Sequence, residues 1–455
     1  MLATVPLSKE FLEQALQKQV LFESKSWKLS PLPWQLNHEQ SRELEAIGQA
    51  CLEFYKAQDR LYQKSRAHAS ILRNKTYTVP WVASYLDKGK PTFLLEHSAF
   101  AKASIPLIIR PDLLWTQEGW ILTELDAVPG GVGLTAFMYQ LYGRHSIGEA
   151  FLEKIWQGLC ELSPHTDPAV AIVVSDESQS YRPEWEWISQ TWHNKGRKAF
   201  CLHPKELSFK ANGVYTPKCH KIDLVYRFFE LFDWPQIPCL EELLKAEREG
   251  HLCITPPIKP HQEEKLSLAL FHHPLLEAYW KEQLSSPSYS ILQKIIPPSW
   301  IVDFSELPPG AYWQGPLVQG KPIHNYTDLR HASQRERNWI LKISGFDETA
   351  WGARGLTLGS DVSQKNWEAA LLKAQAQSLK NTYILQDYKK PLVLEHPVYK
   401  ADGNVYAMQG RLRLCPYYLS DKQRAHYLGA LATFCPKDKK IIHGMQDAAL
   451  LPALS

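Results

Sequence analysis

The spacing of apolar residues predicts a long helix near the start of the chain and strands after it. Between residues 38 and 64, apolar side chains recur every three or four positions with charged residues between them, as in an amphipathic helix. Shorter apolar runs without that period are typical of strands and occur at 93–95, 107–110 and 120–125. The glycines of 129–133 form a loop that leads into a helix predicted over 134–142.

The middle of the chain alternates between strand and helix patterns. Strands are predicted at 170–174, 198–201 and 223–229, and a helix is predicted over 184–195. Such alternation is typical of parallel strands that are joined through helices. We therefore expect a small, open α/β layer in this part of the chain.

The last third follows a proline-rich boundary at 256–260. Strands are predicted at 338–344, 383–388 and 405–414. A glycine-rich loop over 345–359 and an amphipathic helix over 364–379 lie between them. The patterns together predict an α/β (α+β) protein with several subdomains, because a chain of 455 residues rarely folds around one core.

Composition limits the classes of partner. The chain has 51 basic and 48 acidic residues, and its basic clusters are short and isolated, so we expect no nucleic-acid partner. No apolar run approaches the roughly 18 residues of a membrane span, and charges interrupt the first residues, where a signal peptide is apolar. Eight scattered cysteines without a Cys-x-x-Cys pair indicate reduced thiols. We therefore expect a cytoplasmic protein with no membrane partner.

Two of the predicted strands carry charged side chains at alternate positions. Arg110 and Asp112 lie on one strand, and Glu124 and Asp126 on the next, so each pair shares a face. Three carboxylates at one place repel one another unless a cation lies between them, and Mg²⁺ prefers such oxygen ligands. Arg110 would then hold a phosphoryl or carboxylate group with its planar guanidinium. A surface hairpin with an ordinary Arg–Asp pair explains the same pattern.

A second group of residues has the character of a phosphate-binding loop. Lys342 ends an apolar strand, and Gly345, Gly352, Gly355 and Gly359 follow in the glycine-rich loop. A lysine neutralises phosphate charge, and a loop without bulky side chains brings backbone N–H groups against phosphates. The loop is not a Walker A motif, since no Gly-Lys-Ser/Thr follows. A long surface turn is the competing interpretation.

Two later segments add to this picture. The strand at 383–388 ends with Gln386 and Asp387 and can offer backbone groups to an adenine edge, although by itself it is only a buried strand. Arg411 and Arg413 lie two apart in a strand pattern and supply further positive charge. Two solvated arginines on an edge strand are the alternative.

Taken in this order, these elements resemble the circularly permuted ATP-grasp family, to which the synthetase domain of glutathionylspermidine synthase belongs. That family has an Arg-x-Asp strand, a Glu-x-Asn strand and a small α/β lobe. It then has a first ATP-binding lysine, a second lysine before a glycine-rich lid, a hinge strand ending near Gln-Glu, and a late arginine. The resemblance runs from about residue 93 to about residue 416. Asp126 stands where the family has Asn, and Gln386–Asp387 stands where it has Gln-Glu.

The resemblance implies a fold and its division along the chain. The expected fold is ATP-grasp-like and circularly permuted, with a helical N-terminal cap (1–92), the strands of the metal and phosphate site (93–150) and a small α/β lobe (151–250). The ATP-binding lobes with the glycine-rich lid and a closing segment follow (251–455). The first ATP lysine is Lys265, with Lys259 as its rival. The long interval before Lys342 implies an insertion or an enlarged lid over 285–337.

The implied activity is that of an ATP- and Mg²⁺-dependent ligase that joins a carboxylate to an amine through an acyl phosphate. The implied roles are Asp112, Glu124 and Asp126 for the metal; Arg110 and Arg411, or Arg413 in its place, for catalysis; and Lys265, Lys342, Gly345, Gly352, Gly355, Gln386 and Asp387 for ATP. A non-catalytic nucleotide-binding relative and a small-molecule kinase are the alternatives. The sequence identifies neither the carboxylate, the amine nor the oligomeric state.

Overall fold

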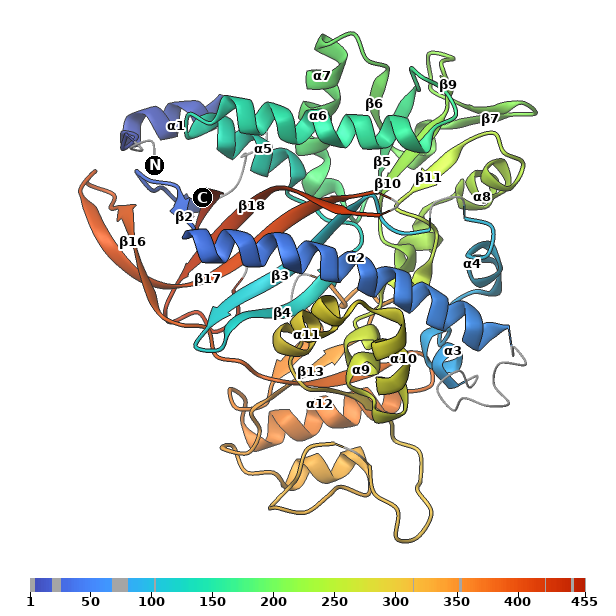
Figure 1. The fold of residues 1–455 in the computed structure, drawn as a ribbon, viewed down its shortest axis with the longest axis vertical. Helices are drawn as coiled ribbons and strands as arrows, with labels where there is room; N and C mark the ends of the chain where they lie inside the picture. Colours follow the sequence, from blue (N-terminus) through green and yellow to red (C-terminus); the bar gives the residue numbers. More distant parts are fainter. Residues whose placement is uncertain are drawn as a thin grey trace. The chain divides into compact units, whose positions relative to one another are not determined.

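The computed structural model describes residues 5–18, 26–67, 81–101, 104–313, 315–351, 354–421, 423–442 and 446–454. The chain divides into two compact units, each made of segments that are far apart in the sequence. Unit 1 comprises 1–52, 100–258 and 391–455, and unit 2 comprises 53–99 and 259–390. Both units contain helices and strands, so the predicted mixed α/β class is confirmed (Figure 1).

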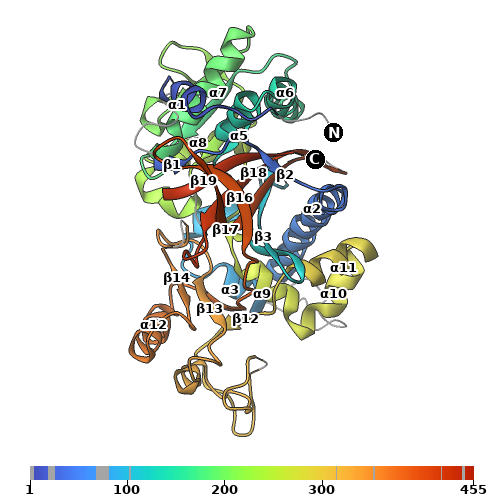
Figure 2. The same cartoon turned by 90° about the vertical axis from the view of Figure 1, so that its left-hand side faces the viewer.

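Unit 1 is built around an eight-stranded sheet with the main order β1-β19-β18-β17-β3-β4. Its strands are β1 (Ser26–Lys28), β2 (Trp34–Gln35), β3 (Ile108–Thr116), β4 (Gly119–Asp126), β16 (Leu394–Tyr399), β17 (Val405–Ser420), β18 (Ala425–Pro436) and β19 (Gln446–Leu454). The long antiparallel strands β17 and β18 lie side by side near its middle (Figure 2). The predicted strands at 107–110, 120–125 and 405–414 are therefore neighbours in one sheet.

Helices pack on both faces of this sheet. The N-terminal part of α2 (His38–Arg66) lies on the face of Tyr418, whose hydroxyl donates to the Leu44 carbonyl. Helices α5 (Val132–Leu141) and α6 (His145–Leu162) belong to the opposite face, where the rings of Phe151 and Tyr417 are 5.6 Å apart. Because consecutive strand residues face opposite ways, the neighbours Tyr417 and Tyr418 serve the two faces. The short helix α1 (Lys9–Gln17) precedes these elements.

A small parallel sheet forms a lobe of unit 1, in the order β11-β10-β5-β6. Its strands are β5 (Val170–Val174), β6 (Ala199–Leu202), β10 (Leu224–Phe228) and β11 (Cys253–Thr255), with α7 (Arg182–Asn194) and α8 (Leu240–Arg248) as its helices. All three strand pairings are parallel, which confirms the expected α/β layer. A hairpin-like sheet of β7 (Ser208–Lys210), β8 (Gly213–Tyr215) and β9 (Lys221–Ile222) is inserted between β6 and β10.

Unit 2 contains an antiparallel sheet in the order β12-β15-β13-β14. Its strands are β12 (Ser299–Val302), β13 (Trp339–Ile343), β14 (Leu356–Leu358) and β15 (Tyr383–Asp387). The helices of this unit are α3 (Trp81–Leu86), α4 (Thr92–His97), α9 (Leu266–His272), α10 (Glu277–Gln283), α11 (Ser286–Ile295) and α12 (Gln364–Gln377). The apolar face of α12 packs against the sheet through Trp367, Leu371 and Ala374.

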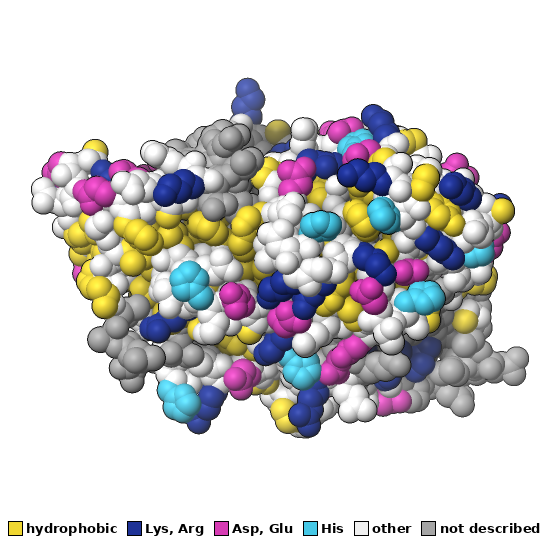
Figure 3. Space-filling view, turned by 90° about the horizontal axis from the view of Figure 1, so that it is seen from above, with side chains coloured by type: hydrophobic (Ala, Val, Ile, Leu, Met, Phe, Trp, Pro, Cys, Tyr) yellow, Lys and Arg dark blue, Asp and Glu magenta, His cyan; other side chains and the backbone are white. Residues whose placement is uncertain are grey.

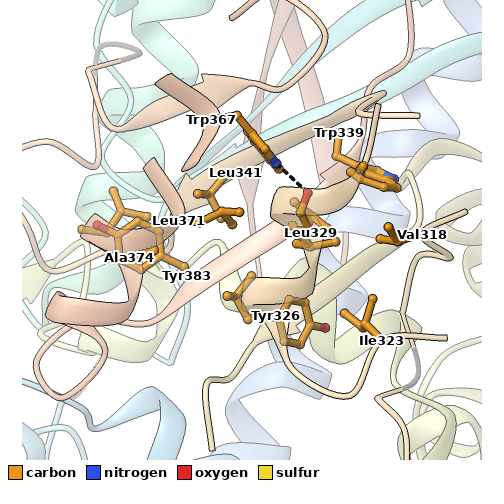
Figure 4. Close-up of a cluster of buried hydrophobic side chains, with 14 residues drawn as sticks. Val318, Ile323, Tyr326, Leu329, Trp339, Leu341, Trp367, Leu371, Ala374 and Tyr383 are labelled. Carbon is orange, nitrogen blue, oxygen red and sulfur yellow. Dashed lines mark hydrogen bonds between the residues drawn. The ribbon is translucent and has the colours of Figure 1, made fainter. Parts of the chain in front are cut away.

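The predicted insertion at 285–337 supplies part of the core of unit 2. Ile323, Tyr326 and Leu329 are buried in one cluster with Trp367 and Trp339 (Figure 4). The indole N–H of Trp367 donates to the Leu329 carbonyl over 3.0 Å, which joins α12 to the short helix η9 (Tyr326–His331). The segment is therefore integral to this fold.

One predicted element is wrong in type. Residues 93–95 were expected as a strand, but they form the middle of α4, which begins after Pro91. A three-residue apolar run does not distinguish a strand from a turn of helix, and here the burial of Leu94 and His97 on one side favours the helix.

The face drawn in Figure 3 carries acidic, basic and histidine side chains interspersed with apolar ones. Within the part of the chain that the structure describes, no helix is long and apolar enough to cross a membrane.

Candidate active site

The β3–β4 hairpin brings the predicted charged residues of unit 1 together. Arg110 pairs with Asp126, and Asp112 pairs with Glu124, so all four side chains start from one face of the hairpin. The register shifts after Asp112, which is the mark of a β-bulge. The pattern of alternate charges in the sequence therefore corresponds to one cluster.

Arg110 is the centre of this cluster. Its Nε donates to Asp112 Oδ1 over 3.0 Å, and its Nη2 lies 2.8 Å from Asp126 Oδ2. Its Nη1 donates to the Gly130 carbonyl over 3.0 Å, in the loop before α5. Three of its N–H groups thus have fixed partners, and the guanidinium is held in one orientation.

Strand β17, the neighbour of β3 on the side away from β4, adds further residues to this cluster. The register with β3 places Arg413 opposite Leu114, so that residues 411, 413, 415 and 417 share the face of the cluster. Arg413 Nη1 donates to Asp112 Oδ2 over 3.1 Å, and Cys415 Sγ donates to Asp112 Oδ1 over 3.4 Å. Asp112 is therefore bound by two arginines and a thiol, and Arg110, Arg413, Asp112 and Asp126 form what we call the arginine cluster.

The two aspartates of the arginine cluster differ in acidity. Burial alone raises the pKa of Asp112, but Arg110 and Arg413 outweigh it and hold the pKa below its usual value. Burial raises the pKa of Asp126, and the attraction of Arg110 does not offset this, partly because Glu124 lies nearby. Two residues that share Arg110 thus differ in pKa because Asp112 has a second arginine beside it and Asp126 has a neighbouring carboxylate.

Asp126→Asn is expected to raise the melting temperature at neutral pH and to leave it unchanged below about pH 4. The contribution of a group with a raised folded pKa is fully present below its unfolded pKa of about 3.9 and is lost as the pH rises through the folded pKa. Asparagine does not ionise, so the variant keeps at neutral pH the stability that the wild type loses when Asp126 becomes charged. Thermal unfolding at a series of pH values measures the difference.

Asp112→Asn is the matched control and should act in the opposite direction. The folded pKa of Asp112 is lowered, so its contribution is present above about pH 4 and is lost as the pH falls through the folded pKa. This variant should be less stable than the wild type at neutral pH and equal to it in strong acid. An Asp126→Asn protein that is also less stable at neutral pH would contradict the assignment.

Arg411 and Arg413 carry buried donors that have no partner in the described part of the chain. The Nε of each is buried without a hydrogen bond, and so is the hydroxyl of Thr433, which pairs with Arg413 across β17 and β18. Arg411 uses its Nη1 to donate to the Lys439 carbonyl over 2.9 Å. A buried donor without a partner costs about 1–3 kcal/mol, so these groups raise the free energy of the folded state unless an acceptor binds them.

The aspartates of the arginine cluster do not fit Mg²⁺ in this arrangement. Both oxygens of Asp112 accept bonds from arginines, and both oxygens of Asp126 are also engaged, Oδ1 with the Val128 N–H at 2.8 Å. Across the described ranges, no group of three or more His, Cys, Asp or Glu side chains is placed to hold a metal ion. Mg²⁺ requires oxygens that point at an open position, and here the arginines take that place.

The loop between β4 and α5 is held by residues that the sequence did not single out. Glu184 on α7 accepts from the N–H groups of Gly131 and Leu134 over 2.8 and 3.2 Å, at the N-terminus of α5. The Tyr417 hydroxyl donates to the Gly130 carbonyl over 2.8 Å. Gly131 has a φ of +81°, which favours glycine. These partners come from distant strands and helices, and no local pattern marks Glu184, Tyr417 or Cys415.

In unit 2, Lys342 and Gln386 lie together as neighbours in the sheet. Lys342 is buried on β13, and its Nζ donates to Gln386 Oε1 on β15 over 2.7 Å. Gln386 Nε2 donates in turn to the Ser299 hydroxyl over 3.0 Å. Asp387 ends β15 and pairs with Trp339. The sheet therefore brings together a lysine and a glutamine that are 44 residues apart in the chain.

The two candidates for the first ATP lysine have different surroundings. Lys259 is buried in an ion pair with Asp59, at 2.8 Å, and His261 binds the same carboxylate. Lys265 lies directly before α9, and its Nζ donates to the Ala350 carbonyl in the glycine-rich loop over 2.7 Å. The ammonium of Lys259 thus neutralises a partly buried carboxylate, whereas that of Lys265 reaches the predicted lid.

The glycines of the loop are required by close contacts of the backbone. A Cβ at Gly345 would lie 2.7 Å from the Glu263 carbonyl oxygen, and one at Gly355 would lie 2.5 Å from that of Thr349. Such contacts exclude a side chain at either position. Gly352 lies outside the described residues.

Comparison with known proteins identifies the fold. No protein-family model matches the chain, and no curated protein does. A glutathione synthetase-like effector from Globodera pallida matches with a TM-score of 0.55 and 11% identity, over 98% of this chain and 96% of that one. The chain has a glutathione synthetase-like fold.

A second solved structure is less similar. It is described as a putative gamma-glutamylcysteine synthetase from Methylobacillus flagellatus and matches with a TM-score of 0.45 and 9% identity, over 79% of this chain and 82% of that one. At these identities the likeness concerns the path of the backbone, and function must be argued from the side chains.

Proposed function

We propose that the chain is an ATP-dependent ligase that joins a carboxylate to an amine through an acyl phosphate. The observation that carries the proposal is the row of buried, unpartnered donors on Arg411 and Arg413 beside the fixed guanidinium of Arg110. Formation of an acyl phosphate brings two anions together, so its main requirement is positive charge that is already in place.

Arg110, Arg411 and Arg413 would bind the anionic groups of the reaction. Arg110 needs no reorganisation, because Asp112, Asp126 and the Gly130 carbonyl already hold it. A donor that is fixed before the reaction stabilises developing charge better than a mobile one. The free Nε groups of Arg411 and Arg413 would supply the hydrogen bonds to oxygen.

In unit 2, Lys342 and Lys265 would bind phosphate oxygens of the nucleotide. Lys342 presents a buried charge beside the neutral amide of Gln386, where the attraction for phosphate is little screened by water. Lys265 would exchange the Ala350 carbonyl for a phosphate oxygen. The close-packed glycines Gly345 and Gly355 would allow backbone N–H groups near the phosphates.

Mg²⁺ enters this proposal only as the ion that is bound to ATP. At the site predicted from Asp112, Glu124 and Asp126, arginines bind both oxygens of Asp112, and the two oxygens of Asp126 are bound by Arg110 and the Val128 N–H, so no step is assigned to a metal held there. The steps above depend on arginine and lysine side chains and on backbone N–H groups of the glycine-rich loop.

A non-catalytic nucleotide-binding protein is the second candidate. The observation in its favour is the same set of closed ion pairs, which leaves the aspartates without an open oxygen. The structural likeness is compatible with either function, since one of the similar proteins is described as a synthetase-like effector.

The test is a screen of carboxylates crossed with amines, with ATP and Mg²⁺, that measures ADP release and identifies products by mass. ADP, phosphate and a new amide support the ligase. ADP with a stable phosphoester shows a kinase, and ATP binding without turnover shows the second candidate; either result overturns the ligase. Arg413→Met should abolish turnover, whereas Arg182→Met, which removes an arginine from an exposed pair with Glu186, should not.

A further inference from the structure

A buried ion pair lies beside the lysines of unit 2 and has no part in the function proposed above. Lys90 Nζ is 2.5 Å from Glu264 Oε1, and the side chains are only 2% and 3% exposed. Removing two charges from water is costly, and removing one partner leaves the other uncompensated. The position of this pair therefore requires an explanation.

The second oxygen of Glu264 connects the pair to Lys265. Glu264 Oε2 accepts the hydroxyl of Ser344, and the same hydroxyl oxygen accepts the Leu266 N–H over 2.8 Å. The Ser344 carbonyl accepts the Lys265 N–H over 3.0 Å. The backbone on both sides of Lys265 is thus tied to Ser344, and Ser344 is tied to the carboxylate that Lys90 neutralises.

Ser344 also ties this network to Lys342. It follows the end of β13, two positions after Lys342 in the chain. The next residue, Gly345, approaches Glu264 so closely that an added Cβ would lie 3.0 Å from the carboxyl carbon. The Lys90–Glu264 ion pair is therefore linked through Ser344 to both Lys265 and Lys342, the lysines that we propose to bind ATP.

Lys90 also contacts the first turn of the glycine-rich loop. Its Nζ is 5.2 Å from the centre of the Phe346 ring, a cation–π distance. Phe346 has a φ of +50°, a conformation that is rare for a bulky residue. Residues held in such conformations depend on their surroundings, and they gather at functional sites.

We propose that Lys90 is a positioning residue for nucleotide binding. By neutralising Glu264 it fixes the backbone that presents Lys265 and Lys342, and it supports the start of the loop at Phe346. This inference rests on the proposed binding of ATP by the two lysines. A merely structural Lys90 would affect stability and leave the affinity of the folded protein for ATP unchanged.

The experiment compares Lys90→Met, Glu264→Gln and the double variant by calorimetric titration with ATP and Mg²⁺, together with thermal unfolding. Each single variant leaves one buried charge and is expected to raise the Kd for ATP about tenfold. The double variant leaves no buried charge and keeps an acceptor for Ser344, so its Kd should return to within about threefold of the wild type. If Lys90→Met does not fold, Glu264→Gln and the double variant provide the same comparison.

Lys259→Met is the matched control, because Lys259 is also buried in an ion pair, 2.8 Å from Asp59. It should lower the melting temperature without changing the Kd. An unchanged Kd in Lys90→Met and Glu264→Gln, with a lowered melting temperature, overturns the positioning role. If Lys342→Met weakens ATP binding in that case, the proposed function stands; if the wild type binds no ATP, both proposals fail.

Discussion

Lys342→Met is expected to weaken ATP binding by roughly 10- to 100-fold without lowering the stability of the fold. Methionine has a similar length, so it fills the space of the lysine stem and removes only the ammonium. The lost interaction is a hydrogen bond to a charged group, worth about 1–3 kcal/mol. The buried ammonium is itself costly in the absence of nucleotide, so its removal should leave stability equal or higher.

Calorimetric titration with ATP and thermal unfolding of one preparation measure both quantities. Lys373→Met, at an exposed position of α12, is the control and should change neither. A lower melting temperature with unchanged ATP affinity would show that Lys342 stabilises the sheet through its hydrogen bond to Gln386. That result would remove the lysine from the proposed site.

Arg110→Met is expected to have the largest effect on stability, a loss of about 3–5 kcal/mol in the free energy of unfolding at neutral pH. The Arg110 side chain is only 15% exposed and compensates both aspartates, so its loss leaves the Asp126 carboxylate, which is 21% exposed, without its partner. Asp112 keeps Arg413, whereas Asp126 loses the only ion pair that the structure gives it in the described ranges. Turnover should be abolished as well.

Chemical denaturation at neutral pH measures this loss, and the double variant Arg110→Met with Asp126→Asn should recover part of it. Arg110→Lys keeps the positive charge but should still be less stable than the wild type. An ammonium does not bind both aspartates and the Gly130 carbonyl with the planar geometry of a guanidinium. Arg182→Met should cost no more than about 0.5 kcal/mol, as expected for an exposed pair. A loss of that small size at Arg110 would contradict the central role of this residue in the cluster.

The hairpin shows how far sequence patterns extend. Alternation of side chains along a strand has a strict period of two, so the shared faces of Arg110 with Asp112, and of Glu124 with Asp126, follow from the sequence. The common face of the two pairs depends on the bulge after Asp112, because the register set by the turn at Thr116 and Gly119 would place Thr123, and not Glu124, opposite Asp112. What the alternation does not contain is the contribution of β17, which lies about 300 residues later and places Arg413 on Asp112.

This distant contribution alters the chemistry of the site. Three carboxylates and one arginine predict a metal site. The structure adds hydrogen bonds from Arg413 and Cys415 to one of these carboxylates, that of Asp112. The balance of charge in the cluster depends on that addition, and the aspartate oxygens are engaged by Arg110, Arg413 and the Val128 N–H. The metal roles of Asp112, Glu124 and Asp126 stay predictions, and we propose an anion-binding function for this face.

The lysines show a similar division. The sequence distinguished Lys342 by its place at the end of an apolar strand, but it left Lys259 and Lys265 as rivals because the interval from Lys265 to Lys342 is longer than the family resemblance implies. The structure gives them different partners, since Lys259 forms an ion pair with Asp59, whereas Lys265 donates to the loop carbonyl of Ala350. Lys90 was not detected at all, because nothing near it in the chain indicates that Glu264 is its partner.

By itself, the sequence determined the elements with a strong period: the long helix that begins at His38, the parallel strands of the lobe, the helix that begins at Gln364 and the charged faces of the hairpin. These follow from local geometry, because the side-chain direction repeats along a helix or strand. Only the tertiary structure decided the type of the short run at 93–95, the place of 285–337 in a core, and the partners of each charged group. Those depend on which distant segments pack together, and the energy of a buried charge is set by its neighbours in space.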